Sequence, residues 1–319
     1  MAQHFLLSSA ARTISLKAVF TMGEDKAYQT FRELRWPETD GEAVCPKCGC
    51  LDTYDISSRR RFKCAGCYHQ FSVTSGTIFA SRKMSFTDLL AAIVIFVNGA
   101  KGVAALRLSR ELDCQYKTAF VLTHKLREAM VREDMGQTLS GTVEIDGAYF
   151  GGYVKPANER RNRRDRRMLV NQSGKRQSVV VVRERDGDML TFVGKSEAEG
   201  VAHVAACVEA GAVIHADEAS HWDALHSRYE ARRINHSVAY SLDGACTNMA
   251  ESFFSRMRRA ELGTHHHIAG QYLDNYAAEM AWREDNRRSP NGTQAGVVAG
   301  AALAAPQSRR FGGYWQRAA

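Results

Sequence analysis

The sequence predicts a mixed α/β protein in which a small metal-stabilised module and a helical segment precede the main domain. Three observations support this prediction: two C-x-x-C pairs before residue 70, helical periodicity over residues 85–131, and alternating strands and helices after Thr142. A chain of 319 residues with 45% apolar content is long enough for two or three domains with real cores. The expected segments are an N-terminal stretch, the module, the helical segment, the α/β domain and a flexible tail, at residues 1–35, 36–80, 81–138, 139–288 and 289–319.

The bulk composition favours a polyanionic partner over a membrane. The formal net charge is +8 and the sequence pI is about 9.1, which suits association with nucleic acid. The longest apolar run, residues 89–97, is roughly half of what a bilayer span needs, so we expect no membrane segment. The N-terminus has no basic stretch that leads into an apolar core, and we therefore expect no export signal.

Four cysteines predict a structural zinc site in the module. Cys45 and Cys48 form one C-x-x-C pair, Cys64 and Cys67 form another, and fifteen residues separate the two pairs. Four thiolates from two such turns make a closed tetrahedral zinc site with no open position for catalysis. Cys50 is an alternative ligand to Cys48, although the C-x-x-C spacing favours Cys48.

The helical segment predicts a helix-turn-helix. Apolar periodicity indicates helices at about 89–97, 103–111 and 115–131, and the last is rich in basic and polar side chains. Two short helices joined by a tight turn can place the second helix in the major groove of DNA, and we assign Lys125 as a DNA contact. The alternative is a helical hairpin that only packs against the rest of the chain.

The order of elements after Thr142 predicts a ribonuclease H-like fold. Strands are expected at 143–149, 178–183, 189–193, 212–216 and 232–236, and helices at 196–210, 222–229 and 247–288. In this order the first and fourth strands are neighbours, and the last helix crosses the edge of the sheet. Asp146 ends an apolar run within the first strand, Asp217 ends a second apolar run at the fourth strand, and Glu251 opens the late helix, so we expect all three at one site.

Three converging carboxylates predict a site for divalent metal ions. Carboxylates that meet at strand ends repel one another, and a pair of Mg²⁺ ions is the usual remedy. Such sites perform phosphoryl transfer. The bland interpretation is three unrelated surface acids, because most Asp and Glu residues are exposed.

Three stretches resemble the insertion-sequence transposases of the DDE superfamily, in the branch with an N-terminal zinc ribbon and an ISXO2-like transposase domain. These are EIDGAYFGG at 144–152, HADE at 215–218 and NMAESFFSRMRR at 248–259. The resemblance implies an enzyme that uses Mg²⁺ or Mn²⁺ to hydrolyse a phosphodiester at each element end, after which the freed 3′-OH attacks target DNA. By the match, Asp146 and Asp217 are metal ligands. The third is Glu251 or Asn248, and we favour the carboxylate because it helps to neutralise the metal.

Basic residues around this site are assigned to DNA. The resemblance implies that Arg258 holds donor DNA, with Arg256 nearby on the same helix. The stretch 155–176 contains nine Lys or Arg against two acids and is expected to loop out between the first two strands. In that loop we assign phosphate contacts, with simple solvation as the alternative, to Arg163, Arg164, Arg166 and Arg167.

The sequence therefore predicts a transposase that acts on double-stranded DNA, as a homo-oligomer, in the bacterial cytoplasm and in association with the nucleoid. Two alternatives remain open at this point. One is a DNA-binding regulator built on the zinc ribbon and helix-turn-helix, with an inactive core. The other is a ribonuclease H-like nuclease.

Overall fold

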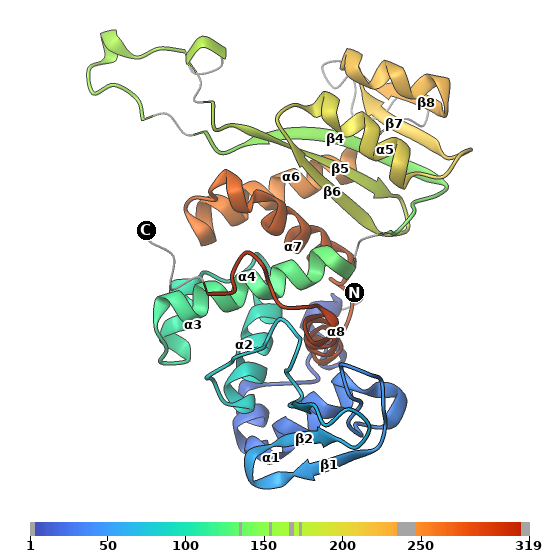
Figure 1. Ribbon diagram of the computed structural model, residues 1–319. Helices are drawn as coiled ribbons and strands as arrows, with labels where there is room; N and C mark the ends of the chain where they lie inside the picture. The colour runs from blue at the N-terminus through green and yellow to red at the C-terminus, as the bar shows by residue number, and fades with distance from the viewer. Residues whose placement is uncertain are drawn as a thin grey trace. The chain divides into compact units, whose positions relative to one another are not determined.

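The chain folds into two compact units, which are coloured from end to end in Figure 1. The computed structural model describes residues 4–133, 136–152, 155–165, 169–171, 174–234 and 246–313. The first unit contains the chain up to residue 133 and again from residue 286, and the second contains residues 134–285. The second unit is thus inserted, along the chain, into the first.

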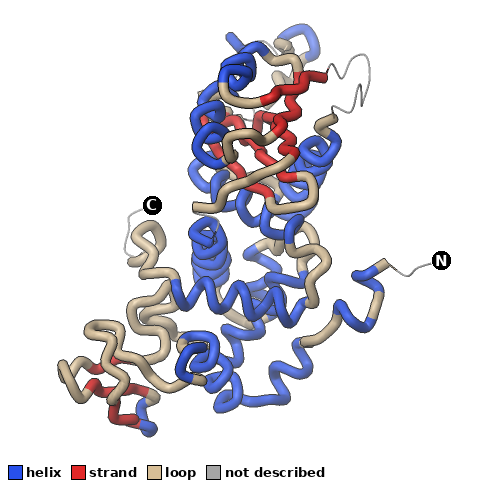
Figure 2. Tube along the Cα trace, turned by 90° about the vertical axis from the view of Figure 1, so that its right-hand side faces the viewer, coloured by secondary structure: helices blue, strands red, loops and turns tan. Residues whose placement is uncertain are grey.

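Helices are the main regular secondary structure of the first unit, and Figure 2 shows helices in blue. Their bounds are α1 Leu16–Arg35, α2 Phe86–Asn98, α3 Ala105–Glu111, α4 Tyr116–Glu133 and α8 Asn291–Ala304. The apolar run at 89–97 lies inside α2, where every one of its residues is buried. This helix packs against α1 and α8, and α4 packs against α3 and α8. The run is therefore a core helix of this unit.

The C-terminal segment is the main correction to the sequence prediction. We expected a flexible tail from residue 289, but α8 lies in this segment and buries Val298, Ala299 and Leu303. Its many small residues allow close packing against neighbouring helices, and a sequence poor in charge and rich in Gly and Ala hides that role. Asn291 ties this helix to the N-terminal segment by accepting hydrogen bonds from the backbone N–H groups of Thr13 and Ile14 at 2.9 and 3.1 Å.

A three-stranded antiparallel sheet follows α1 in the first unit. Its strands, in the order β1-β2-β3, are β1 Thr53–Ile56, β2 Arg61–Cys64 and β3 Gln70–Phe71. The rings of Phe62 and Phe71 lie 5.6 Å apart, and each makes an edge contact with Trp36. This aromatic cluster joins the end of α1 to the sheet.

The second unit has the ribonuclease H-like fold that the sequence predicts. Its mixed sheet has the order β6-β5-β4-β7-β8, with β4 antiparallel to β5 and parallel to β7. The elements are β4 Thr142–Phe150, β5 Gln177–Glu184, β6 Met189–Gly194, α5 Gly200–Cys207, β7 Val213–Asp217, β8 Glu230–Ile234, α6 Asn248–Ala260 and α7 Leu273–Asp285.

Two details of this unit differ from the prediction. The segment at 222–229 is a 3-10 helix, Ser220–Ser227, rather than an α-helix. The helix expected at 247–288 is interrupted: α6 ends at Ala260, a π-helical turn follows at Glu261–His265, and α7 begins at Leu273. The backbone of His266, with a φ of 59°, turns the chain here.

The sheet carries a separate core on each face. Alternate residues of β4, Ala148 and Phe150 among them, pack with α6 and α7. The other set, Val143 and Ile145, packs with β7 residues and α5. Asp146 has the same parity as Ala148 and therefore belongs to the face that α6 covers. No helix in the described part of the chain is long and apolar enough to cross a membrane.

Candidate active site and zinc centre

The sheet brings the two predicted aspartates to neighbouring strands. The parallel register of β4 and β7 pairs Glu144 with His215, and two residues further on the strands reach Asp146 and Asp217. Because side chains alternate along a strand, both aspartates lie on the face covered by α6. Glu251 lies in the first turn of that helix. Residues more than one hundred positions apart are thereby collected at one end of the sheet.

The electrostatics of Asp146 show that the three acids interact. Burial, together with the negative charges of Asp217, Glu197 and Glu251, raises the pKa of this carboxyl to about 7. A hydrogen bond of 2.8 Å from the backbone N–H of Gly147 opposes the shift. Asp146 thus lies in a half-buried, negatively charged environment that a divalent cation would relieve.

The loop after β7 is held by Arg233 of β8. The carboxylate of Asp217 accepts a hydrogen bond of 3.1 Å from the backbone N–H of Ala219. Arg233 donates to the main-chain oxygens of Asp217 and Ala219 and also pairs with Asp223. The turn after β7 and the adjacent strand β8 therefore both fix the position of Asp217.

Glu197 is an acid of this site that the sequence analysis missed. It lies in the short 3-10 helix before α5, and burial together with the charge of Asp217 raises its pKa. A Cβ atom at Gly147 would come within 2.4 Å of the Glu197 side chain, so a glycine beside Asp146 permits this approach. His221 lies 3.6 Å from its carboxylate. Glu197 is distant from Asp146 in the sequence, and only the tertiary fold brings the two residues to one site.

Asn248 and Glu251 differ in their surroundings. Asn248 is exposed at the start of α6, whereas Glu251 is half-buried and raises the pKa of Asp146. The charge interaction favours Glu251 as the third carboxylate. Unlike the four cysteine sulfurs of the zinc centre, the carboxylate oxygens of these three acids do not all lie within 4.8 Å of one another.

The four predicted cysteines form one compact site in the first unit. The sulfurs of Cys45, Cys48, Cys64 and Cys67 all lie within 4.8 Å of one another. The Cys45–Cys67 and Cys48–Cys64 sulfur pairs are 3.6 and 3.5 Å apart. Tetrahedral zinc with Zn–S bonds of about 2.3 Å requires roughly 3.8 Å between sulfurs, so the set fits this ion.

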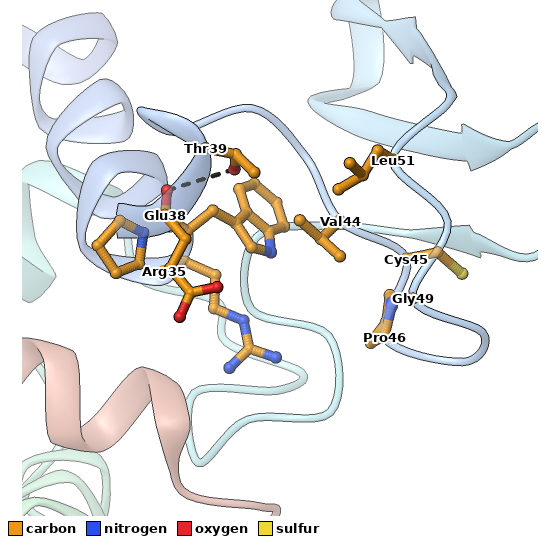
Figure 3. Close-up of a pocket in the computed structure, with 10 residues that line it drawn as sticks. Arg35, Glu38, Thr39, Val44, Cys45, Pro46, Gly49 and Leu51 are labelled. Carbon is orange, nitrogen blue, oxygen red and sulfur yellow. Dashed lines mark hydrogen bonds between the residues drawn. The ribbon is translucent and has the colours of Figure 1, made fainter.

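Two further observations identify the zinc ligands. The backbone N–H of Cys67 donates to the Cys64 sulfur at 3.4 Å, a hydrogen bond that stabilises a ligating thiolate. Cys50 lies outside the cluster and directs its thiol to the main-chain oxygen of Asp52. Figure 3 shows the first knuckle, Cys45 to Gly49, across a cavity of about 520 Å³ from the end of α1.

The basic residues assigned to DNA lie in different settings. Arg258 is exposed, with its guanidinium 5.9 Å from the ring of Phe150, whereas Arg256 forms an ion pair with Glu284. Arg163 and Arg164 are exposed in the basic loop. Arg166 and Arg167 lie outside the described residues.

The helical pair α3–α4 is present, but much of its basic character is internal. His124 and Arg127 of α4 are buried, and a ring contact of 5.0 Å joins His124 to Phe311. Lys125 is half-buried, and desolvation lowers its pKa. The start of α4, residues 115–118, is exposed. If α4 contacts DNA, its N-terminal turn is the accessible part, as in other helix-turn-helix units.

A polar groove beside the zinc ribbon is a second basic surface. It has a volume of about 1070 Å³ and is lined by Arg59, Arg61 and Arg82 together with several serines. Arg59 and Arg61 are exposed at the hairpin tip. Arginine and hydroxyl side chains of this kind commonly contact phosphates.

Models of known protein families match segments of both units. Residues 138–285 match the ISXO2-like transposase domain, and residues 22–70 match the transposase zinc-ribbon domain. The chain belongs to the zinc-ribbon transposases with an ISXO2-like domain. The first match spans β4 to α7 and includes the carboxylate site of this transposase, and the second includes all four zinc ligands. No curated protein matches the chain.

Proposed function

We propose that this transposase binds the ends of its insertion sequence and cleaves and joins DNA strands with two divalent metal ions. Asp146, Asp217 and Glu251 would hold the ions, with Asn248 at the edge of the site. The observation that carries the proposal is the β4–β7 register, which puts Asp146 and Asp217 on one face of neighbouring strands, with Glu251 in the first turn of α6. Hard oxygen donors that repel one another fit Mg²⁺ or Mn²⁺.

The residues of the chain would act by position and charge. When bound, the two ions supply activation of the attacking oxygen and stabilisation of the leaving oxygen. Asp146 and Asp217 are fixed by strands and by hydrogen bonds to Gly147 and Ala219, so their geometry exists before DNA arrives. Gly151 and Gly152, with φ values of 68° and 66°, turn the chain sharply after β4 and keep bulky side chains away.

DNA would contact basic side chains of both units. In the second unit these are Arg258 and the exposed arginines of the basic loop, Arg163 and Arg164. In the first unit they are the Arg59–Arg61 groove and the N-terminal turn of α4. Two element ends must be processed together, so we propose that the active form is a homo-oligomer on DNA. Phosphate contacts of this kind make binding strongly dependent on salt.

The deciding experiment uses the purified protein with DNA that carries the ends flanking its own gene. Wild type would be compared with Asp146→Ala, Asp217→Ala, Glu251→Ala and Asn248→Ala for 3′-end nicking and for joining into a plasmid in Mg²⁺. We expect wild type to cleave and join, and the first three variants to bind DNA without doing either. Loss with Asn248→Ala but not Glu251→Ala would move the third ligand. Binding by wild type without cleavage would instead identify a DNA-binding regulator.

A further inference from the structure

Glu144 is a carboxylate with no solvent exposure, two residues before Asp146 on the same strand face. It accepts hydrogen bonds from the backbone N–H groups of Met249 at 2.9 Å and Ala250 at 3.4 Å. These two amides belong to the first turn of α6 and have no acceptor within that helix. Glu144 therefore caps α6 from a strand of the sheet, more than one hundred residues away in sequence.

Neighbouring residues hold the Glu144 side chain in this position. Arg185 pairs with its carboxylate at 3.2 Å and also donates to the His215 Nδ1 atom at 3.0 Å. His215 lies beside Glu144 in the β4–β7 register and accepts from the backbone N–H of Cys246 at 3.2 Å. Glu144 of β4 and His215 of β7 are neighbours in the sheet. Together they bind the segment that precedes α6 and the first turn of α6.

The next row along the same strands is the carboxylate site. Asp146 and Asp217 lie two residues beyond Glu144 and His215, which corresponds to roughly 6.6 Å along each strand. Glu251 follows directly after Met249 and Ala250 on α6. The contacts of Glu144 and His215 with the start of α6 consequently determine where Glu251 lies relative to Asp146.

We propose that Glu144 is a positioning residue that sets α6, and with it Glu251, against Asp146 so that the metal site is complete. This inference rests on the proposed function, because it assigns Glu251 to the metal ions. Burying an ionised carboxylate is costly, and two backbone amides together with Arg185 offset that cost. An alanine here would leave the amides of Met249 and Ala250 buried without an acceptor, and α6 would shift to satisfy them.

The test measures metal binding separately from activity. Mn²⁺ would be titrated into the full-length, zinc-loaded protein and followed by electron paramagnetic resonance, without DNA. Glu144→Ala and Glu144→Gln would be compared with wild type. Glu279→Gln is the matched control, because Glu279 is also a buried carboxylate but pairs with Arg283 of its own helix, α7. Amide hydrogen exchange at Met249 and Ala250 would report directly on the cap.

We expect Glu144→Ala to weaken Mn²⁺ binding by about 10–100-fold, as loss of residues that orient metal ligands commonly does. Exchange at Met249 and Ala250 should accelerate, with zinc content and DNA affinity unchanged. Glu144→Gln keeps an acceptor oxygen but loses the charge, so its affinity should fall between wild type and Glu144→Ala. If the alanine variant does not fold, Glu144→Gln alone tests the positioning role.

Wild-type Mn²⁺ affinity in a Glu144 variant whose Met249 and Ala250 amides exchange faster than those of wild type would overturn the positioning role, even if the variant melts earlier. A different result marks failure of the proposed function. If wild type neither binds Mn²⁺ nor cleaves element ends, the metal site itself is refuted, and this inference falls with it.

Discussion

Asp146 combines burial with three neighbouring negative charges, and its protonation should therefore control the stability of the metal-free protein. Its pKa is about 7 in the folded chain, above the ordinary value of 3.8. A carboxyl whose pKa is raised by folding is held as the neutral acid below pH 7 and becomes an uncompensated charge above it. Folding stability should consequently fall as pH rises from about 4 through 7.

The variant Asp146→Asn removes this charge and should raise the melting temperature of the metal-free protein at pH 8 but hardly at pH 5. The expected gain at pH 8 is about 2–4 °C if the relief amounts to roughly 1 kcal/mol. Differential scanning fluorimetry at both pH values, with zinc retained, measures it. Adding Mg²⁺ at pH 8 should stabilise wild type and leave the variant unchanged. Equal shifts at both pH values would show that Asp146 does not titrate as described.

The cysteine cluster gives a second prediction at the scale of single residues. Cys45→Ser should lower the zinc content from about one ion per chain to near zero, because four thiolates are needed to close the site. Cys50→Ser is the control and should retain zinc, since the Cys50 thiol points to the Asp52 carbonyl. Inductively coupled plasma mass spectrometry measures the content. Zinc loss in Cys50→Ser would indicate that Cys50 is a zinc ligand in place of Cys48.

At the scale of elements, strand ends could be predicted from sequence but contacts between distant elements could not. Asp146 and Asp217 each close an apolar run, and this pattern predicts that they lie together on neighbouring strands, although Asp146 lies in the middle of β4 and not at its end. Glu144 and Glu197 carry no such signal, because their roles arise only when β4 meets α6 and the segment before α5. The break between α6 and α7 escaped prediction as well.

Arg256 and Arg258 of α6 lie in different surroundings, so their substitution should separate DNA contact from folding. Arg258 is exposed, so Arg258→Ala should weaken binding to element ends and lower the slope of log affinity against log salt by roughly 1. Arg256 pairs with Glu284, so Arg256→Ala should lower the melting temperature and leave the salt slope unchanged. Fluorescence anisotropy at several salt concentrations measures the slopes. A reduced slope for Arg256→Ala alone would reverse the two assignments.

At the scale of the whole molecule, the catalytic unit is an insertion into a unit that both chain ends build. The sequence analysis divided the chain into consecutive segments and therefore missed this arrangement. Helix α8 packs against α2, and Asn291 bonds to Thr13 and Ile14 of the N-terminal segment and to Asn98 at the end of α2. The first unit can therefore close only after the last part of the chain has been made.

Removal of the Asn291 side chain should loosen the first unit without loosening the second. Its hydrogen bonds are partly exposed, so Asn291→Ala should cost about 1–2 kcal/mol, equivalent to roughly 5–30-fold faster opening. Hydrogen exchange should accelerate by that factor in α2 and remain unchanged in β4 and β5, because each unit has its own core. Truncation after Arg288 removes α8 and should abolish protection of α2 altogether. Equal acceleration in β4 and β5 would show instead that the two units open as one.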